Sequence, residues 1–328
     1  MSRDGASALA FLLVLSFATT ARSQLTAESN RSEKAALGKL LFFDTRLSRD
    51  QTVSCATCHD PHKGWTDRVP VSIGIDKKKG KRNAQTILNT VLYYSEHASQ
   101  TLFWDGRASS LEEQAIHPIV NPAEMGSSKE KAVATLSAIE GYRPYFKKAF
   151  GSDAVTIDRV GSAIAAFEKT LVTMNSPYDR YSSGEETAIS TEAVLGFKLF
   201  LGKGTCTACH SSNLFSDVQF HNIGVGEDKK PPDMGRFEVT KEDRDRGAYR
   251  TPTLRNLRYT PPYMHDGSIK TLAEVIDFYD RGGLQNEWLD PDIQPLNLTP
   301  AEKRQLLAFM EALNADPLEM DPPKDLPR

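Results

Sequence analysis

Four cysteines arranged in two identical motifs constrain this chain more than any other feature. The motifs are CATCH at 55–59 and CTACH at 206–210. Two disulfides or a zinc site would also use four cysteines, but neither requires a histidine directly after each pair. In C-x-x-C-H the thiols form thioethers to haem vinyl groups, and the imidazole becomes the proximal iron ligand. The sequence therefore predicts two covalently bound haem c groups, attached through Cys55, Cys58, Cys206 and Cys209 and ligated by His59 and His210.

The spacing of the motifs indicates two domains in tandem. They begin at positions 55 and 206 of a 328-residue chain, about one domain's length apart. Proline, serine and glycine collect between Asn175 and Gly184, a composition typical of a boundary. We expect an N-terminal haem domain over residues 24–177 and a C-terminal haem domain over residues 178–328.

The first 23 residues have the pattern of a signal peptide. Arg3 supplies positive charge, Ala8 to Phe17 form a short apolar run, and small residues precede a cut between Ser23 and Gln24. A membrane anchor is the alternative, but the run is too short to span a bilayer. The pattern predicts export to the periplasm without a membrane anchor.

Helix signals dominate the rest of the chain. Residues 110–113, 271–274 and 299–302 each match a capping box, and the last has proline at the first helical position. Apolar residues recur at helical spacing through 157–171 and 306–313. Since no long alternating run predicts a substantial sheet, we expect a mainly α protein with two cytochrome c-like haem domains and long loops around the haems.

The charge distribution excludes some partners. The formal net charge is −3, and no long basic face indicates nucleic acid binding. The one dense basic cluster, DKKKGKR at 76–82, is expected to be a solvated loop. Docking of an acidic partner there is the alternative.

A series of motifs in fixed order covers most of the chain. From about Glu33 to Phe309 it runs LGKLLFFDTRLS, SCATCHDP, FWDGRASSLEEQAIHPIVNPAEMG, GTCTACH, FHNIGVG, RGAYRTPTLRN and PYMHDGS. In this order the sequence resembles the bacterial di-haem cytochrome c peroxidase and MauG superfamily. The resemblance implies an oxidoreductase whose N-terminal haem reacts with hydrogen peroxide and whose C-terminal haem handles electrons.

The resemblance also implies roles for residues near the N-terminal haem. Glu124 matches the acid that moves a proton between the peroxide oxygens, Gln114 the residue that orients it, and Pro118 a third residue of the distal pocket. Without the resemblance, Glu124 would be a loop carboxylate and Gln114 a solvated helix position. Trp104 matches the tryptophan that relays electrons between the haems. On its own it would be an ordinary buried aromatic residue.

Two further features follow from the resemblance. Asn83, Thr260 and Pro262 match positions that hold a calcium ion at the domain interface, through one side-chain and two backbone oxygens. Peroxidases of the family that need reductive activation carry a histidine in the loop after the first haem. The matching loop, residues 71–77, has none, so we expect an open N-terminal haem. His117 lies between Gln114 and Pro118 and is left open as a bystander or a proton relay.

The sixth ligand of the C-terminal haem separates two kinds of enzyme. Tyr279 lies on the apolar face of the helix expected after residue 271, where periodicity alone predicts a core tyrosine. Typical peroxidases of the family have methionine 14 residues after the histidine of PY-x-H, whereas MauG-type members have tyrosine, as here. A phenolate favours oxidised iron and a thioether favours reduced iron. Met264 is a second candidate ligand, and His265 is expected to be a buried polar residue near the haem.

These features leave two enzymatic hypotheses and one of another class. The first is an exported MauG-type enzyme that uses peroxide to oxidise a partner protein. The second is a cytochrome c peroxidase that takes electrons from a small c-type cytochrome or cupredoxin. MauG has a tryptophan two residues before its second haem cysteine, where this chain has Gly204, so the protein substrate is left open. A non-catalytic electron carrier would give Gln114, Pro118 and Glu124 no role.

Overall fold

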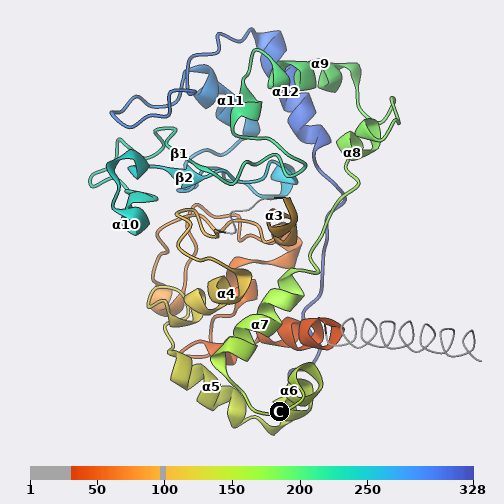
Figure 1. Ribbon diagram of the computed structural model, residues 1–328, viewed down its shortest axis with the longest axis vertical. Coiled ribbons are helices and arrows are strands. Elements are labelled where there is room, and N and C mark those ends of the chain that lie inside the picture. The colour runs from red at the N-terminus through yellow and green to blue at the C-terminus, as the bar shows by residue number, and fades with distance from the viewer. Residues whose placement is uncertain (1–30, 97–100) are drawn as a thin grey trace, which may run out of the picture.

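The computed structural model describes residues 31–96 and 101–328 (Figure 1). The predicted signal peptide, residues 1–23, lies outside the described residues. The protein is mainly helical, as predicted, and its named strands are two residues long and antiparallel. The α-helices and strands are the helix at 31–43, α2 (Cys55–Cys58), α3 (Thr90–Glu96), α4 (Leu111–Val120), α5 (Lys129–Ser137), α6 (Arg143–Phe150), α7 (Ile157–Glu168), α8 (Pro177–Ser182), α9 (Thr191–Leu201), β1 (Phe220–His221), α10 (Phe237–Thr240), β2 (Tyr249–Arg250), α11 (Leu272–Asp280) and α12 (Pro300–Ala312).

Short 3-10 turns connect many of these elements. Long loops lie between the N-terminal half, residues 31–177, and the C-terminal half, residues 178–328 (Figure 1). The turns are η1 (Thr45–Leu47), η2 (Pro61–Lys63), η3 (Ile75–Lys77), η4 (Glu140–Tyr142), η5 (Cys206–Ala208), η6 (Asp243–Asp245) and η7 (Leu257–Tyr259).

Local caps set where the helices begin. The capping boxes predicted at Thr271 and Thr299 are confirmed at the starts of α11 and α12. The third prediction is half right. Ser110 caps α4 by accepting from the backbone N–H of Glu113, but the Glu113 carboxylate accepts from the backbone N–H and hydroxyl of Ser109 instead of closing the box.

The two largest hydrophobic clusters belong one to each half of the chain, and the two halves lie one above the other in Figure 1. In the N-terminal half the helix at 31–43 crosses α7 so closely that a Cβ on Gly38 would lie 1.9 Å from the Ala163 carbonyl oxygen. In the C-terminal half α9 crosses α12 in the same way, because a Cβ on Gly196 would lie 1.9 Å from the Gln305 carbonyl oxygen. Each half is therefore built on a pair of helices in backbone contact at a glycine.

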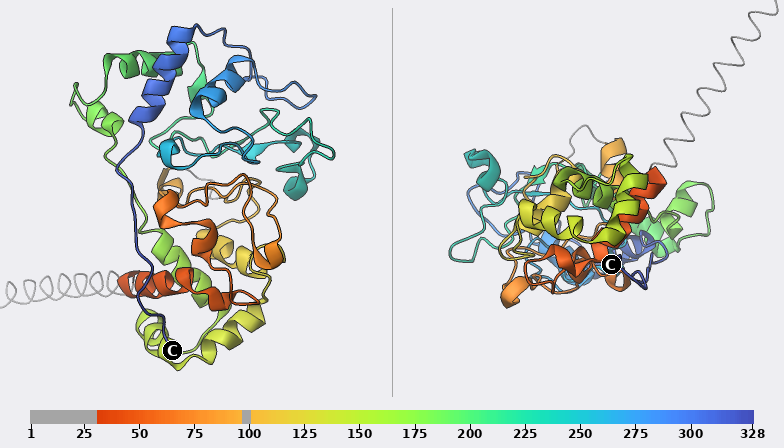
Figure 2. Two further views of the ribbon diagram at one scale, coloured as in Figure 1. Left: turned by 180° about the vertical axis from the view of Figure 1, so that it is seen from behind. Right: turned by 90° about the horizontal axis from the view of Figure 1, so that it is seen from below.

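The chain after α12 runs back along the N-terminal half and ends beside α6 (Figures 1 and 2). Trp65 Nε1 donates to the Leu318 carbonyl at 2.7 Å, and Leu318 and Met320 pack against the N-terminal core. The backbone N–H of Gly141 donates to the Arg328 carbonyl at 2.8 Å. The end of the chain, within the range predicted as the C-terminal domain, thus stabilises the other half.

The basic cluster at 76–82 corrects one expectation. Its lysines are exposed, but the Arg82 side chain is only 8% exposed. Arg82 bonds to Asp105 at 2.6 Å and to Asp233 at 2.7 Å, so it joins segments from both halves. The solvated-loop prediction is wrong for Arg82, because its partner acids lie far away in the sequence.

In the described part of the chain, none of the helices combines the length and the apolar character that a bilayer crossing needs.

Candidate di-haem active site

A cavity of about 720 Å³ lies between the two halves and has walls from both. Cys58 and His59 border it from the N-terminal half, and Cys206, Cys209 and His210 border it from the C-terminal half. Cys55 packs beside it against the N-terminal core. Both predicted haem attachment sites therefore face one continuous space.

The two proximal histidines are oriented in the same way. Nδ1 of His59 lies 3.1 Å from the Trp65 carbonyl oxygen, and Nδ1 of His210 lies 2.8 Å from that of Phe215. Trp65 and Phe215 adopt left-handed φ angles of 60° and 54°. Because a carbonyl can only accept, Nδ1 carries the hydrogen and Nε2 keeps its lone pair for iron. Burial lowers the pKa of both imidazoles, which keeps them neutral, and this donor set fits two haem c groups.

The predicted distal residues come together on the N-terminal side of the cavity. Gln114 and Pro118 are four residues apart on α4 and both line the cavity, as expected for one helix face. Glu124 follows in the next turn, where its Oε1 accepts from Asn121 Nδ2 at 2.6 Å. Burial raises the pKa of Glu124, while the positive charge of Arg107 opposes the shift. The site thus holds a carboxyl group that keeps its proton to higher pH than usual.

The loop at 71–77 packs against the segment that carries Glu124. The backbone N–H of Ile75 donates to the Glu124 carbonyl at 2.8 Å, and a Cβ on Gly74 would lie 2.2 Å from the Ala123 carbonyl oxygen.

His117 does not line the cavity. Its side chain is 38% exposed, and its ring packs edge-on against Phe103, so the geometry favours the bystander interpretation.

Both candidate sixth ligands border the cavity, but their settings differ. Tyr279 on α11 lines the wall, and within the described residues its hydroxyl makes no hydrogen bond. Burial raises the pKa of this phenol, and the nearby Cys209 and Cys206 thiols add to the effect. The thiol contribution would vanish in thioethers. Met264 has a left-handed φ of 75° and also lines the cavity.

His265 is buried, as expected, and stacks on Tyr249 with ring centroids 3.6 Å apart and an interplanar angle of 11°. Burial lowers the pKa of His265 to about 4, so it is neutral. Trp104 meets its ring edge-on at 6.4 Å. Trp104 lines the cavity, and its Nε1 donates to the Asn83 carbonyl at 2.9 Å.

The three residues predicted to hold calcium also border this cavity. Asn83, Thr260 and Pro262 come from opposite halves of the chain and share its wall. Asn83 Nδ2 donates to the Val69 carbonyl at 2.9 Å, which leaves its side-chain oxygen as the atom available to a cation.

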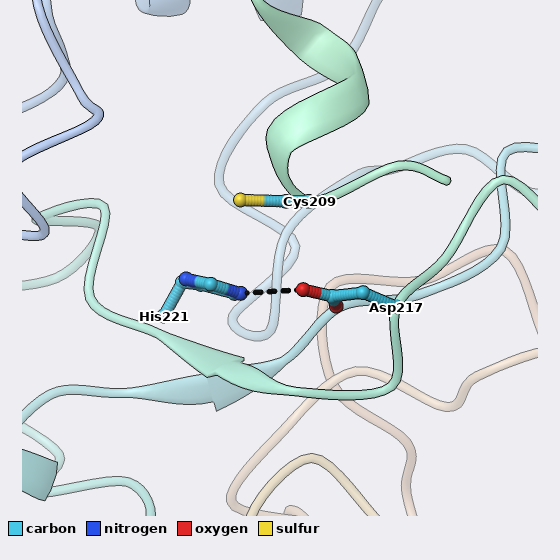
Figure 3. A group of neighbouring side chains, drawn as sticks. All are labelled: Cys209, Asp217 and His221. Carbon is cyan, nitrogen blue, oxygen red and sulfur yellow. Dashed lines mark hydrogen bonds and ion pairs between the residues drawn. The ribbon is translucent and has the colours of Figure 1, made fainter. Parts of the chain in front are cut away.

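Sequence reasoning missed a charged cluster beside Cys209 (Figure 3). His221 Nδ1 lies 2.6 Å from an Asp290 oxygen, and Nε2 lies 3.0 Å from an Asp217 oxygen. Burial opposes protonation of His221, but bonds to Asp217, Cys209 and Asp290 raise its pKa. The Cys209 contribution would vanish in a thioether, whereas those of the two carboxylates would remain. Because Cys209 belongs to a haem attachment motif, the cluster is part of the haem surroundings. The histidine of FHNIGVG was its only signal in the sequence.

Glu168 at the end of α7 was also missed. It is 4% exposed, lines the cavity, and has a buried Oε2 without a hydrogen-bond partner. Burial raises the pKa of Glu168 to about 8, Glu112 adds to the rise and Lys169 opposes it. A helical glutamate carries no sequence signal of this kind, since glutamate usually lies on the surface.

Two C-x-x-C-H sites on one cavity define a c-type protein with two haems, and comparisons with known proteins identify its family. The family model for di-haem cytochrome c peroxidase matches residues 32–187. Methylamine utilization protein MauG of Methylorubrum extorquens is 43% identical over 296 residues, covering 89% of this chain and 81% of that protein. Cytochrome c551 peroxidase of Nitrosomonas europaea is 39% identical over 287 residues, covering 87% and 81%.

A solved structure agrees. A MauG-like protein associated with microbial copper homeostasis superposes with a TM-score of 0.79 at 34% identity, covering 88% of this chain and 91% of that one. The chain belongs to the di-haem cytochrome c peroxidase and MauG family. It is a di-haem oxidoreductase with two haem c groups.

Proposed function

We propose that this enzyme is an exported di-haem oxidoreductase of MauG type. It uses hydrogen peroxide at an open N-terminal haem to oxidise a partner protein, and the C-terminal haem shares the oxidising equivalents. The observation that carries the proposal is Tyr279, whose phenol lines the cavity near Cys206 and Cys209. An anionic oxygen ligand favours oxidised iron, which suits storage of oxidising equivalents. Export rests on Arg3 and the apolar run from Ala8 to Phe17.

The haems would supply the binding and reduction of peroxide, in which two electrons and two protons convert one peroxide to two waters. Glu124 holds a proton because burial raises its pKa. Since Asn121 occupies Oε1, Oε2 is the oxygen that gives and takes this proton. The Gln114 amide, on the same wall, orients peroxide by hydrogen bonding. Pro118 closes the wall without a backbone donor.

Trp104 would relay electrons between the halves, with its ring held by the bond to the Asn83 carbonyl. We also propose that a calcium ion is held by the Asn83 side-chain oxygen and the backbone oxygens of Thr260 and Pro262. Oxygen donors are the ligands that calcium takes in proteins. The ion would bridge segments from both halves.

A cytochrome c peroxidase, supplied with electrons by a small c-type cytochrome or cupredoxin, is the second candidate. Gly204 favours it. A Cβ at this position would lie 2.9 Å from the Leu199 carbonyl oxygen, so the loop before Cys206 would have to shift to accept the tryptophan that MauG carries there.

The two candidates differ in how the fully ferric enzyme responds to peroxide. We would mix it with one equivalent of peroxide and follow visible and near-infrared spectra by stopped flow, beside Tyr279→Phe. The MauG-type proposal expects a long-lived oxidised state with a near-infrared band in the wild type and its loss in the variant. Tyr263→Phe is a matched control, because Tyr263 lines the same cavity but its hydroxyl donates to the Leu257 carbonyl. A ferric enzyme that reacts only after one haem is reduced would instead support the peroxidase.

A further inference from the structure

Arg250 places a buried positive charge on the wall of the haem cavity without a counter-charge. It is 3% exposed, and its Nη1 is buried without a hydrogen-bond partner. Its Nε donates to the Phe103 carbonyl at 3.4 Å, and its guanidinium carbon lies 4.6 Å from the centre of the Tyr93 ring. No carboxylate among the described residues forms an ion pair with it. A buried cation without an anion is strongly destabilising.

Within residues 31–96 and 101–328, the other buried guanidinium groups have carboxylate partners. Arg255 is 2% exposed and bonds to both oxygens of Asp179 at 2.9 Å. Arg82 bonds to Asp105 and Asp233. Arg82 and Arg255 border the cavity as well, so what distinguishes Arg250 is that no carboxylate of the described residues pairs with it. Its anion can come from whatever fills the cavity.

We propose that Arg250 receives a propionate carboxylate of a haem bound in this cavity. The guanidinium fork matches a carboxylate with two parallel hydrogen bonds. The backbone N–H of Arg250 also donates to the Trp104 carbonyl at 2.8 Å. One residue of β2 therefore ties the Trp104 segment to the C-terminal half and provides the carboxylate site beside it. The inference requires the two haems but does not depend on the oxidation of a partner protein.

The charge has a measurable consequence. A fixed positive charge near a haem, and neutralisation of its carboxylate, both favour the reduced iron. Without Arg250 the reduced state of that haem becomes less favourable. The carboxylate also loses the partner that keeps it ionised, so it takes up a proton as pH falls.

The test is a spectroelectrochemical titration of the purified di-haem protein without peroxide, which is independent of the proposed function. Because thioethers hold the haems, they stay attached in the variants. In Arg250→Met we expect the reduced-to-oxidised ratio of one haem at fixed potential to fall about tenfold, which is ~59 mV for a one-electron couple. Its potential becomes more dependent on pH. Arg250→Lys keeps the charge and most of the potential.

Arg236→Met is the matched control. Arg236 lies at the same interface, donates to the Asp105 and Gly106 carbonyls and does not line the cavity, so both potentials should change little. Unchanged potentials in Arg250→Met would overturn the proposal. Equal shifts in Arg250→Met and Arg250→Lys would assign Arg250 a purely structural role and also overturn it. If the wild-type potential changes with the concentration of added inorganic phosphate, Arg250 binds a free anion and not a haem carboxylate.

Discussion

In the N-terminal half His59 lines the cavity together with Gln114, Pro118 and Glu124, whereas in the C-terminal half His210 lines it together with Tyr279. The two sides of the cavity that carry the proximal histidines are alike. Each proximal histidine is held through Nδ1 by a carbonyl five or six residues later, and each half is built on two helices that cross at a glycine.

The difference lies in the chemistry of the side chains that share the cavity with each histidine. The N-terminal side has a carboxyl group whose pKa burial raises, a group suited to moving protons. The C-terminal side has a phenol without a hydrogen bond in the described residues, a group suited to binding a metal. The comparison teaches that two similarly held histidines can serve different chemistries when different side chains share the cavity with each of them.

Replacing Glu124 should have the largest effect, and only on the N-terminal site. Glu124→Gln keeps an oxygen for Asn121 but carries no transferable proton, so we expect the rate of reaction with peroxide to fall by about 10²–10⁴-fold. Stopped-flow kinetics measure the rate, and the potential of the C-terminal haem should stay unchanged. Glu113→Gln, at an exposed acid on α4, is the control. A decrease of less than tenfold would remove Glu124 from its proposed role.

Deleting residues 316–328 should weaken the N-terminal half, although these residues come from the other end of the chain. The deletion removes the packing of Leu318 and Met320 and the bond from Trp65. We expect a loss of about 3 kcal/mol in unfolding free energy. Denaturant unfolding followed by the spectrum of each haem would show it. Leu318→Ala should cost less, and a loss confined to the C-terminal haem would contradict the interpretation.

Replacing Tyr279, the proposed sixth ligand, should alter only the C-terminal site. In Tyr279→Met a thioether replaces the phenol, so we expect the potential of that haem to rise by at least ~59 mV, a tenfold change in the ratio of reduced to oxidised iron. Potentiometric titration measures both haems together. If the potential does not change, Tyr279 does not bind the iron, and Met264→Leu is then the next variant to examine.

The most gradual effect concerns how stability depends on pH. Glu168 has its pKa raised to about 8 by burial, so the folded protein keeps this proton where the unfolded chain has lost it. Its contribution is complete below the ordinary carboxyl pKa and is lost as pH rises through about 8, with a slope of up to ~1.4 kcal/mol per pH unit. Denaturant midpoints across this range should decrease in the wild type and be flatter in Glu168→Gln.

Glu112→Gln provides the opposite sign. Burial alone would raise the pKa of Glu112, but the hydrogen bond to Lys169 lowers it. The contribution of Glu112 to stability is therefore present above the ordinary carboxyl pKa and is lost as pH falls. A wild-type stability that does not decrease toward pH 8 more steeply than that of Glu168→Gln would show that the Glu168 carboxyl is ionised in the folded protein.

The sequence by itself determined the features that depend on neighbouring residues. Haem attachment is encoded in five consecutive residues at 55–59 and again at 206–210, because the thiols and the ligand act together over one turn. The starts of α11 and α12 follow from side chains three residues apart. The position of Tyr279 on the inner face of α11 follows from helical periodicity.

Only the tertiary structure decided which groups are buried and which distant groups meet. The exposed loop expected at Arg82 became an ion pair with Asp105 and Asp233, and the end of the chain joined the N-terminal core. Arg250 and Glu168 became buried groups on the cavity wall. The physical reason is that desolvation and charge pairing depend on distances in space, and no local pattern records which residues far away in the chain will be near.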